Sequence, residues 1–141
     1  MKRIDRLKPP RRAVLAGAVC VMLSCAGGDS PFPYEEILRR NAEEMNKKCP
    51  MPAGEGIRLD STSAGPGRRF TYCYSLTRQT LDSMDVNALQ AELKPILIDN
   101  LKNNRDIGLL RKNKVNMYYR FFDRKHRFVV TIPILPGEYA R

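Results

Sequence analysis

Apolar residues in the middle of the chain recur first with the period of a helix and then with that of a strand. In residues 34–49 every third or fourth side chain is apolar and most others are charged, which predicts an amphipathic helix. Residues 56–77 show two runs around the turn sequence SAGPG, the second of them alternating, which predicts two strands. In this second run Cys73 lies on the face opposite a row of larger side chains, formed by Phe70, Tyr72, Tyr74 and Leu76.

The C-terminal half repeats this change of period. Any of Asp82, Ser83 and Asp85 is a suitable helix cap, and a stripe of apolar residues follows: Val86, Leu89, Leu93, Ile96, Leu97 and Leu101. Pro95 lies inside this stripe and predicts a kink or a restart of the helix. One more helical turn is expected at 105–110. Two strands at 114–122 and 127–135 follow, joined by a tight basic turn, and Pro133 predicts a sheet edge or a strand end.

The predicted elements follow one another in the order α-β-β-α-(α)-β-β. Two hairpins and two main helices predict an α+β fold, in which the helices pack on an antiparallel sheet of about four strands. The 117 residues after residue 24 suffice for one small domain with one core. We assign this domain to residues 34–141, preceded by a flexible tether over residues 25–33.

Residues 1–24 have the composition of an export signal. Basic residues dominate the first twelve positions, and an apolar run of twelve residues follows, from Ala13 to Ser24. A bilayer span needs roughly twenty apolar residues, whereas a basic start before a short apolar segment is typical of a secretory signal peptide. A helix of the mature fold is disfavoured, because Gly17 and the breaker sequence AGGDSPFP interrupt it.

The end of this segment resembles a bacterial lipobox in the sequence MLSC, in which Cys25 would receive a diacylglycerol and become the mature N-terminus. Met22 and Leu23 depart from the commonest lipobox residues, so ordinary cleavage near Cys25 is the alternative. The sequence PRRAVLAG resembles a twin-arginine signal, which leaves both the general and the twin-arginine export routes open.

Export changes how the charge of the chain is interpreted. Six of the 25 Lys and Arg residues and one of the 15 Asp and Glu residues lie in residues 1–24, so the net charge of +10 falls to about +5 in the exported part. A strongly basic chain would point to nucleic acid, but an exported protein rarely meets it, and we expect no nucleic-acid partner. A mildly cationic surface suits anionic lipid headgroups, acidic glycans or an acidic protein.

Export also changes how the four cysteines are interpreted. Cys20 lies in the signal and Cys25 is the lipidation candidate, which leaves Cys49 and Cys73 as a pair in an oxidising compartment. We expect these two to form a disulfide that closes a loop of about 25 residues and contributes about 3 kcal/mol. A metal or redox site is the weaker alternative, since there is no CxxC and the one histidine, His126, is far away in a polar turn.

The sequence patterns of catalysis are missing. There is no GxSxG, and a nucleophile needs a neighbouring base that a single turn histidine does not supply. Pairs of glutamates at 35–36 and 43–44 fall on the exposed side of the first helix, and the zinc and calcium patterns are absent. We therefore expect no enzyme activity, no cofactor and no metal site.

The C-terminal hairpin is the least ordinary feature, because aromatic and basic residues are mixed in it. By strand parity one face carries Met117, Tyr119 and Phe121, and the other carries Tyr118, Arg120 and Phe122. One of these two sets must belong to the core. Tyr and Arg dominate interface hot spots, so we predict a partner-binding surface at this hairpin. Its predicted residues are Tyr118, Arg120, Phe122, Arg124, Lys125 and Arg127. The alternative is that helices cover both faces and the turn is merely solvated.

The order of these motifs resembles that of small exported bacterial proteins of unassigned activity. In those proteins a helix that ends like MNKKCPMP precedes a strand like IRLDS, a glycine turn and a Tyr-x-Tyr strand. The resemblance covers about residues 34–132 and implies no catalytic residues. A lipidated small α+β domain is also similar in architecture to secretion pilotins and other envelope assembly lipoproteins.

Two main hypotheses follow. The first is a non-enzymatic lipoprotein of the bacterial cell envelope, anchored by lipid and facing the periplasm, that binds an envelope protein as an assembly factor, adaptor or inhibitor. The second is a periplasmic or secreted protein that binds a small ligand or an anionic glycan, in a pocket between the sheet and the long helix lined by Tyr72 and Tyr74. An enzyme is a third, weaker alternative.

Overall fold

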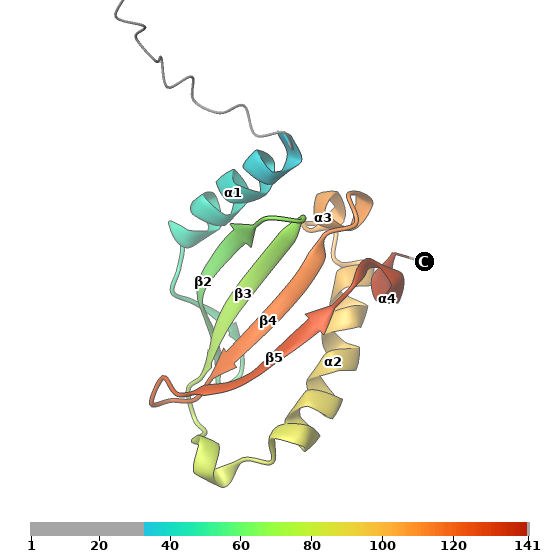
Figure 1. Ribbon diagram of the computed structural model, residues 1–141. Coiled ribbons are helices and arrows are strands. Elements are labelled where there is room, and N and C mark those ends of the chain that lie inside the picture. Colours follow the sequence, from blue (N-terminus) through green and yellow to red (C-terminus); the bar gives the residue numbers. More distant parts are fainter. Residues whose placement is uncertain (1–32, 141) are drawn as a thin grey trace, which may run out of the picture.

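The structure is a computed structural model that describes residues 33–140, a five-stranded sheet with helices packed against it (Figure 1). The elements in chain order are α1 (Pro33–Asn46), β1 (Met51–Gly54), β2 (Ile57–Gly65), β3 (Arg69–Leu76), the 3-10 turn η1 (Leu81–Ser83), α2 (Val86–Asn103), α3 (Gly108–Lys112), β4 (Asn116–Phe122), β5 (Phe128–Ile134) and α4 (Pro136–Tyr139). The predicted α+β class is confirmed. The signal peptide, Cys25 and residues 25–32 of the tether lie outside the described residues.

The sheet differs from the expected one in its central pair of strands. The strand order is β1-β2-β3-β4-β5, and every neighbouring pair is antiparallel except β3 and β4, which are parallel. Parallel neighbours need a long crossover connection, and the segment that contains α2 supplies it. The sheet is therefore mixed rather than antiparallel. The additional strand, β1, was not predicted, because Pro50 and Pro52 indicate the end of the preceding helix. Since β1 lies at the edge of the sheet, it tolerates Pro52.

The helix α1 packs on β2, and one side chain joins the two elements. Leu38 and Ala42 of α1 are buried against the sheet. Asn46 donates its side-chain amide to the carbonyl oxygen of Thr62 at 2.8 Å and accepts from the N–H of Thr62 at 2.7 Å. Because β1 pairs only with the first residues of β2, it does not reach the backbone of Thr62. The side chain of Asn46 makes the two backbone hydrogen bonds that a neighbouring strand would otherwise supply there.

The covered face of the sheet carries a ladder of aromatic rings. The parallel register places Tyr72 beside Tyr119 and Tyr74 beside Phe121. In each pair the ring centroids lie 5.4 Å apart, with interplanar angles of 9° and 18°. Stacked pairs of this kind add to the apolar burial of each ring. The sequence had predicted that Met117, Tyr119 and Phe121 share a face, and that face is the core.

The helix α2 begins after Asp85, one of the three predicted caps, and runs on past its proline. The carboxylate of Asp85 accepts the backbone N–H groups of Asn87 and Ala88. The helix continues through Pro95 to Asn103, without the expected restart. Leu101 alone among its apolar residues is fully buried, and Ile96 is 59% exposed. Within residues 33–140, no helix combines the length and the apolarity needed to cross a bilayer.

The disulfide expected between Cys49 and Cys73 is not formed, and both residues carry free thiols. The alternation of β3 explains this. Cys73 points away from the aromatic ladder and lines a hollow on the opposite face of the sheet. Cys49 packs against the buried core on the helix side, where burial, and then the negative charge of Asp60, raise the pKa of its thiol.

We expect both thiols to react with an alkylating reagent when the protein is denatured without a reductant. Peptide mapping should then find an alkyl group on Cys49 and another on Cys73. A single peptide pair linked through these residues would contradict the structure.

Candidate partner-binding surface

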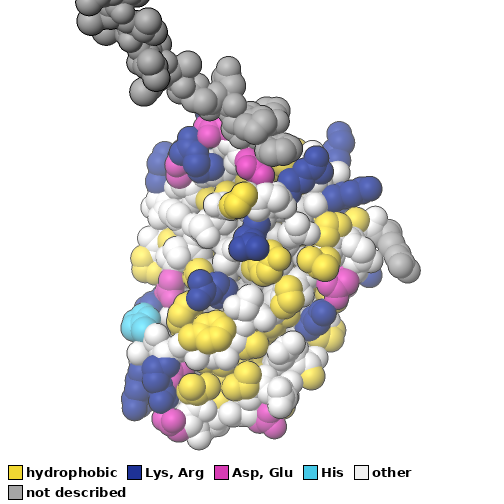
Figure 2. Space-filling view, viewed as in Figure 1, with side chains coloured by type: hydrophobic (Ala, Val, Ile, Leu, Met, Phe, Trp, Pro, Cys, Tyr) yellow, Lys and Arg dark blue, Asp and Glu magenta, His cyan; other side chains and the backbone are white. Residues whose placement is uncertain are grey.

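The sheet has one face covered by α1 and α2 and a second face over which no helix packs in residues 33–140 (Figure 1). We call the second face the open face. Figure 2 shows hydrophobic and basic side chains interspersed over the strands. The alternate residues of β3, β4 and β5 that point away from the core build this face: Arg69, Thr71, Cys73, Tyr118, Arg120, Phe122, Phe128 and Thr131.

Two arginines lie over aromatic rings on the open face. The guanidinium carbon of Arg69 is 4.8 Å from the ring centroid of Tyr118. That of Arg120 lies 5.5 Å from the ring of Phe122 and 5.6 Å from that of Phe128. The rings of Phe122 and Phe128 meet edge to face at 6.0 Å. Cation–π contacts of this kind hold each guanidinium extended over the ring.

These arginines carry unbalanced charge. Arg69 and Arg120 are exposed, and neither takes part in any ion pair of residues 33–140. Between them lies a shallow hollow of about 450 Å³, with Ser63, Thr71 and Thr131 in its lining. Phe128 beside it is 49% exposed. The open face therefore offers positive charge, aromatic surface and hydroxyl groups together.

The basic turn between β4 and β5 is built around a buried carboxylate. Asp123 is 0% exposed and accepts the backbone N–H groups of Leu81, Lys125 and Arg127. The guanidinium of Arg127 donates to Asp123 at 2.9 Å and to Asp82 at 2.9 Å. Hydrogen bonding to Arg127, helped by its charge, lowers the pKa of the Asp82 carboxyl.

The six predicted contact residues therefore divide into three groups. Tyr118, Arg120 and Phe122 lie together on the open face, as their parity predicts. Arg124 and Lys125 are exposed at the tip of the turn, beside the exposed His126. Arg127 is paired with two acids, Asp123 of the turn and Asp82 of η1.

Arg69 and Phe128, which add charge and aromatic surface to the open face, were not predicted from the sequence. Arg69 belongs to β3, and nothing local indicates that β3 lies beside β4. Phe128 joins the face through an irregularity in the pairing of β4 with β5, which places Phe122 opposite Phe128. The alternation of Arg69 with Thr71 and Cys73 was the only available signal.

The pocket expected around Tyr72 and Tyr74 is occupied by packed rings. Tyr72 is 7% exposed and lies against Phe70, Tyr74 and Tyr119. Burial, and then the neighbouring thiol of Cys49, raise the pKa of Tyr74 to about 12. Tyr72 belongs to the core and Tyr74 packs against it, and neither lines any of the hollows described for residues 33–140.

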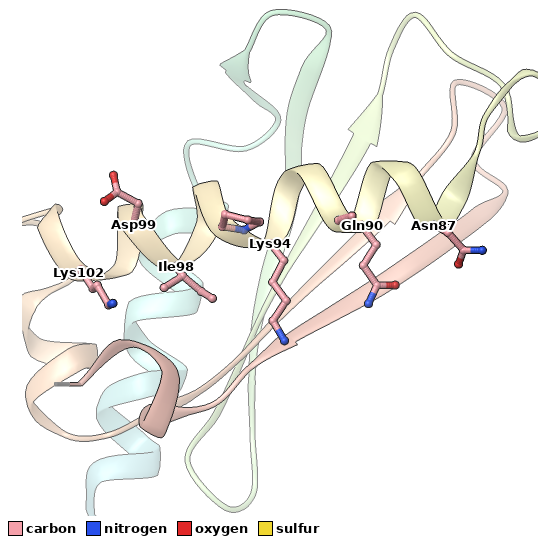
Figure 3. A pocket seen from close by; sticks show the side chains of 8 residues that line it. Asn87, Gln90, Lys94, Ile98, Asp99 and Lys102 are labelled. Atoms are coloured by element: carbon pink, nitrogen blue, oxygen red, sulfur yellow. The ribbon is translucent and has the colours of Figure 1, made fainter.

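Two further hollows, both along α2, show no convergent chemistry. One of about 690 Å³ follows a single stripe of α2, where Gln90, Lys94 and Ile98 lie along one side of the helix (Figure 3). Lys94 pairs with Glu138 at 2.8 Å. A smaller hollow, of about 340 Å³, lies between α2 and the end of β3. Among residues 33–140 no group of His, Cys, Asp and Glu side chains could hold a metal ion.

Comparison with solved structures identifies the fold. A protein described as secreted, from Pseudomonas aeruginosa, is 20% identical with a TM-score of 0.64, over 78% of this chain and 95% of that chain. EpsS, the pilotin of the Vibrio vulnificus type 2 secretion system, is 4% identical with a TM-score of 0.61, over 77% and 93%. AspS, the type II secretion system pilotin of Vibrio cholerae, is 10% identical with a TM-score of 0.57, over 75% and 92%. At these identities the likeness shows a shared fold.

Sequence comparison adds one match. The family model described as Domain of unknown function (DUF8479) matches residues 33–131, which include α1 and most of β5. No curated protein matches the chain.

Proposed function

The chain belongs to the family of the domain of unknown function DUF8479, and we propose that it is a non-enzymatic protein of the cell envelope that binds another envelope protein through the open face of its sheet. A lipid on Cys25 anchors it to the membrane, facing the periplasm. The observation that carries the proposal is that Arg69 and Arg120 lie over aromatic rings on a sheet face where, within residues 33–140, no helix packs and neither arginine forms an ion pair.

The physical chemistry of the open face favours a protein partner. Aromatic residues and arginine are enriched in interface hot spots, and an exposed Phe beside arginines combines apolar area with charge. Stacking limits the conformers of each arginine before binding, so less side-chain entropy is lost on association. The shape is also suitable, because a broad and shallow face accommodates a protein surface better than a small ligand.

The charges of the open face define the partner further. Two guanidinium groups that form no ion pair within residues 33–140 favour a surface that presents carboxylates beside apolar side chains. Arg124 and Lys125 at the turn tip add a positive rim, which would accelerate association at low ionic strength. The fold shared with two pilotins of type II secretion systems supports an assembly role.

The decisive variant is Arg120→Glu, tested by crosslinking and pull-down from native envelopes with a C-terminal tag. We expect capture of the partner to fall at least about tenfold, because the reversal removes a hot-spot contact and adds repulsion. The melting temperature should change by no more than about 2 °C, since Arg120 is exposed and has no ion-pair partner in residues 33–140.

Arg105→Glu is the matched control, because it makes the same charge change at an exposed position in the loop between α2 and α3. It should leave capture intact. A second variant, Glu92→Arg, reverses a charge in the hollow between α2 and the end of β3. Loss of capture in Glu92→Arg, with none in Arg120→Glu, would overturn the assignment to the open face and transfer it to that hollow.

A further inference from the structure

A second surface, at the end of the domain where α1 begins, is lined by basic side chains. A hollow of about 650 Å³ is lined by eight residues from the ends of α2, α3 and α4: Lys102, Asn103, Gly108, Arg111, Lys112, Lys114, Tyr139 and Ala140. Four of these are Lys or Arg and none is acidic. We call this surface the basic hollow.

Short hydrogen-bonded connections hold the walls of the basic hollow. The guanidinium of Arg111 donates to the carbonyl oxygens of Leu101 at 2.8 Å and Asn104 at 3.3 Å, which fixes α3 against the end of α2. The hydroxyl of Tyr139 donates to the carbonyl oxygen of Val115 and joins α4 to the start of β4. Side-chain hydrogen bonds to backbone carbonyl oxygens thus hold the walls of the hollow in place, while its lysines are exposed.

The charge in the basic hollow is not neutralised by the fold. Lys102, Lys112 and Lys114 take part in none of the ion pairs within residues 33–140. Of the acids on adjoining elements, Glu138 pairs with Lys94, while Asp99, which accepts the side-chain amide of Asn103, and the exposed Asp106 form no ion pair with these lysines. A concave surface with several positive charges attracts an anion.

The position of the basic hollow relative to the membrane anchor indicates which anion. The hydroxyl of Tyr34, near the start of α1, donates to the carbonyl oxygen of Leu109 in α3 at 3.2 Å, so the chain enters the domain beside α3. Pro33 follows Cys25 by eight positions in the sequence, a reach of at most about 28 Å. A lipid on Cys25 therefore keeps this end close to the headgroups. Leu109, which is 49% exposed, projects beside the lysines.

We propose that the basic hollow binds the phosphate of an anionic phospholipid headgroup, such as phosphatidylglycerol, in the membrane that carries the anchor. Each Lys near such a surface adds to the attraction, and Leu109 would contact the apolar boundary of the headgroup layer. Binding would orient α3 toward the membrane and the β4–β5 turn away from it (Figure 1). This proposal rests on the lipid anchor at Cys25 in the proposed function, but the hollow and the open face share no residue, so partner binding at the open face and lipid binding here can fail separately.

The test uses the mature protein purified from cells that express the full chain, placed in lipid nanodiscs. One set of discs contains phosphatidylcholine alone, and the other an equal mixture of phosphatidylcholine and phosphatidylglycerol. We expect the amides of residues 108–114 to exchange hydrogen at least about tenfold more slowly in the mixed discs. Lys112→Glu with Lys114→Glu should abolish this difference. Inorganic phosphate added to the phosphatidylcholine discs should give no comparable slowing.

Lys47→Glu with Lys48→Glu is the matched control, because these two exposed lysines at the far end of α1 give the same charge change. This control should keep the difference between discs. Equal exchange in both discs would overturn the proposal. So would a difference that survives Lys112→Glu with Lys114→Glu. Slowing by inorganic phosphate to the same extent would show a free-anion site and overturn the lipid assignment.

Discussion

Asp123→Asn will lower the melting temperature by about 10 °C or more. The carboxylate is fully buried and accepts three backbone N–H groups as well as the guanidinium of Arg127. An asparagine keeps the shape of the side chain, but an NH2 group replaces one of the two carboxylate oxygens and then faces hydrogen-bond donors. Loss of the carboxylate also weakens the attachment of η1, because the N–H of Leu81, which is distant in the sequence, donates to this carboxylate.

The same variant changes how stability depends on pH. Burial by itself raises the pKa of Asp123, but hydrogen bonds from the backbone N–H groups of Leu81 and Arg127, then from the Arg127 side chain and Lys125, hold it well below the ordinary value. The ordinary pKa is about 4, so the charged carboxylate stabilises the fold above pH 4. This stabilisation is lost as the pH falls from 4 toward the lower folded pKa.

Melting temperatures measured from pH 7 down to pH 2 test both effects. The wild-type protein should lose more stability below pH 4 than Asp123→Asn does, because the variant has already lost the carboxylate. Asp106→Asn is the control, since it removes an exposed charge between α2 and α3. Equal effects of the two variants on the melting temperature would show that Asp123 does not organise the turn.

The fold could be predicted as far as local periodicity reaches. The alternation in β3 and β4 sorted the side chains of each strand correctly onto two faces, and Asp85 was among the three caps predicted for α2, because these signals depend on neighbouring residues. The pairing of β3 with β4 depends on the path of α2 across the sheet. No local pattern encodes that path, so two antiparallel hairpins were the simpler prediction, and the parallel register was missed.

In the candidate site, too, the features set by local sequence could be predicted and those set by the tertiary fold could not. Parity placed Tyr118, Arg120 and Phe122 together, which the structure confirms. Arg127 was grouped with them because it is basic and close in sequence, but its partner Asp82 comes from a segment that only tertiary folding brings near. The disulfide was predicted from compartment and cysteine number, although the alternation of β3 already placed Cys73 opposite the aromatic ladder.

Tyr119→Ala should reduce the free energy of unfolding by about 3–5 kcal/mol, whereas Tyr118→Ala should reduce it by about 1 kcal/mol or less. Tyr119 is 4% exposed, and its ring lies 5.4 Å from that of Tyr72 and 6.4 Å from that of Tyr74. Its truncation leaves a cavity in the middle of the ladder. Tyr118 is half-buried under Arg69 on the open face, so its truncation leaves a solvated gap.

Chemical denaturation measures the free energies of unfolding of both variants, and pull-down from native envelopes measures their effect on partner capture. Tyr118→Ala should weaken partner capture severalfold, because it removes the ring beneath Arg69, while Tyr119→Phe should keep both stability and capture close to those of the wild type. Neighbouring residues on one strand would then separate stability from binding, as a sheet with one covered and one open face requires. If instead the two alanine variants cost the same unfolding energy, the face of Tyr118 would also be core, and the partner would have to bind elsewhere.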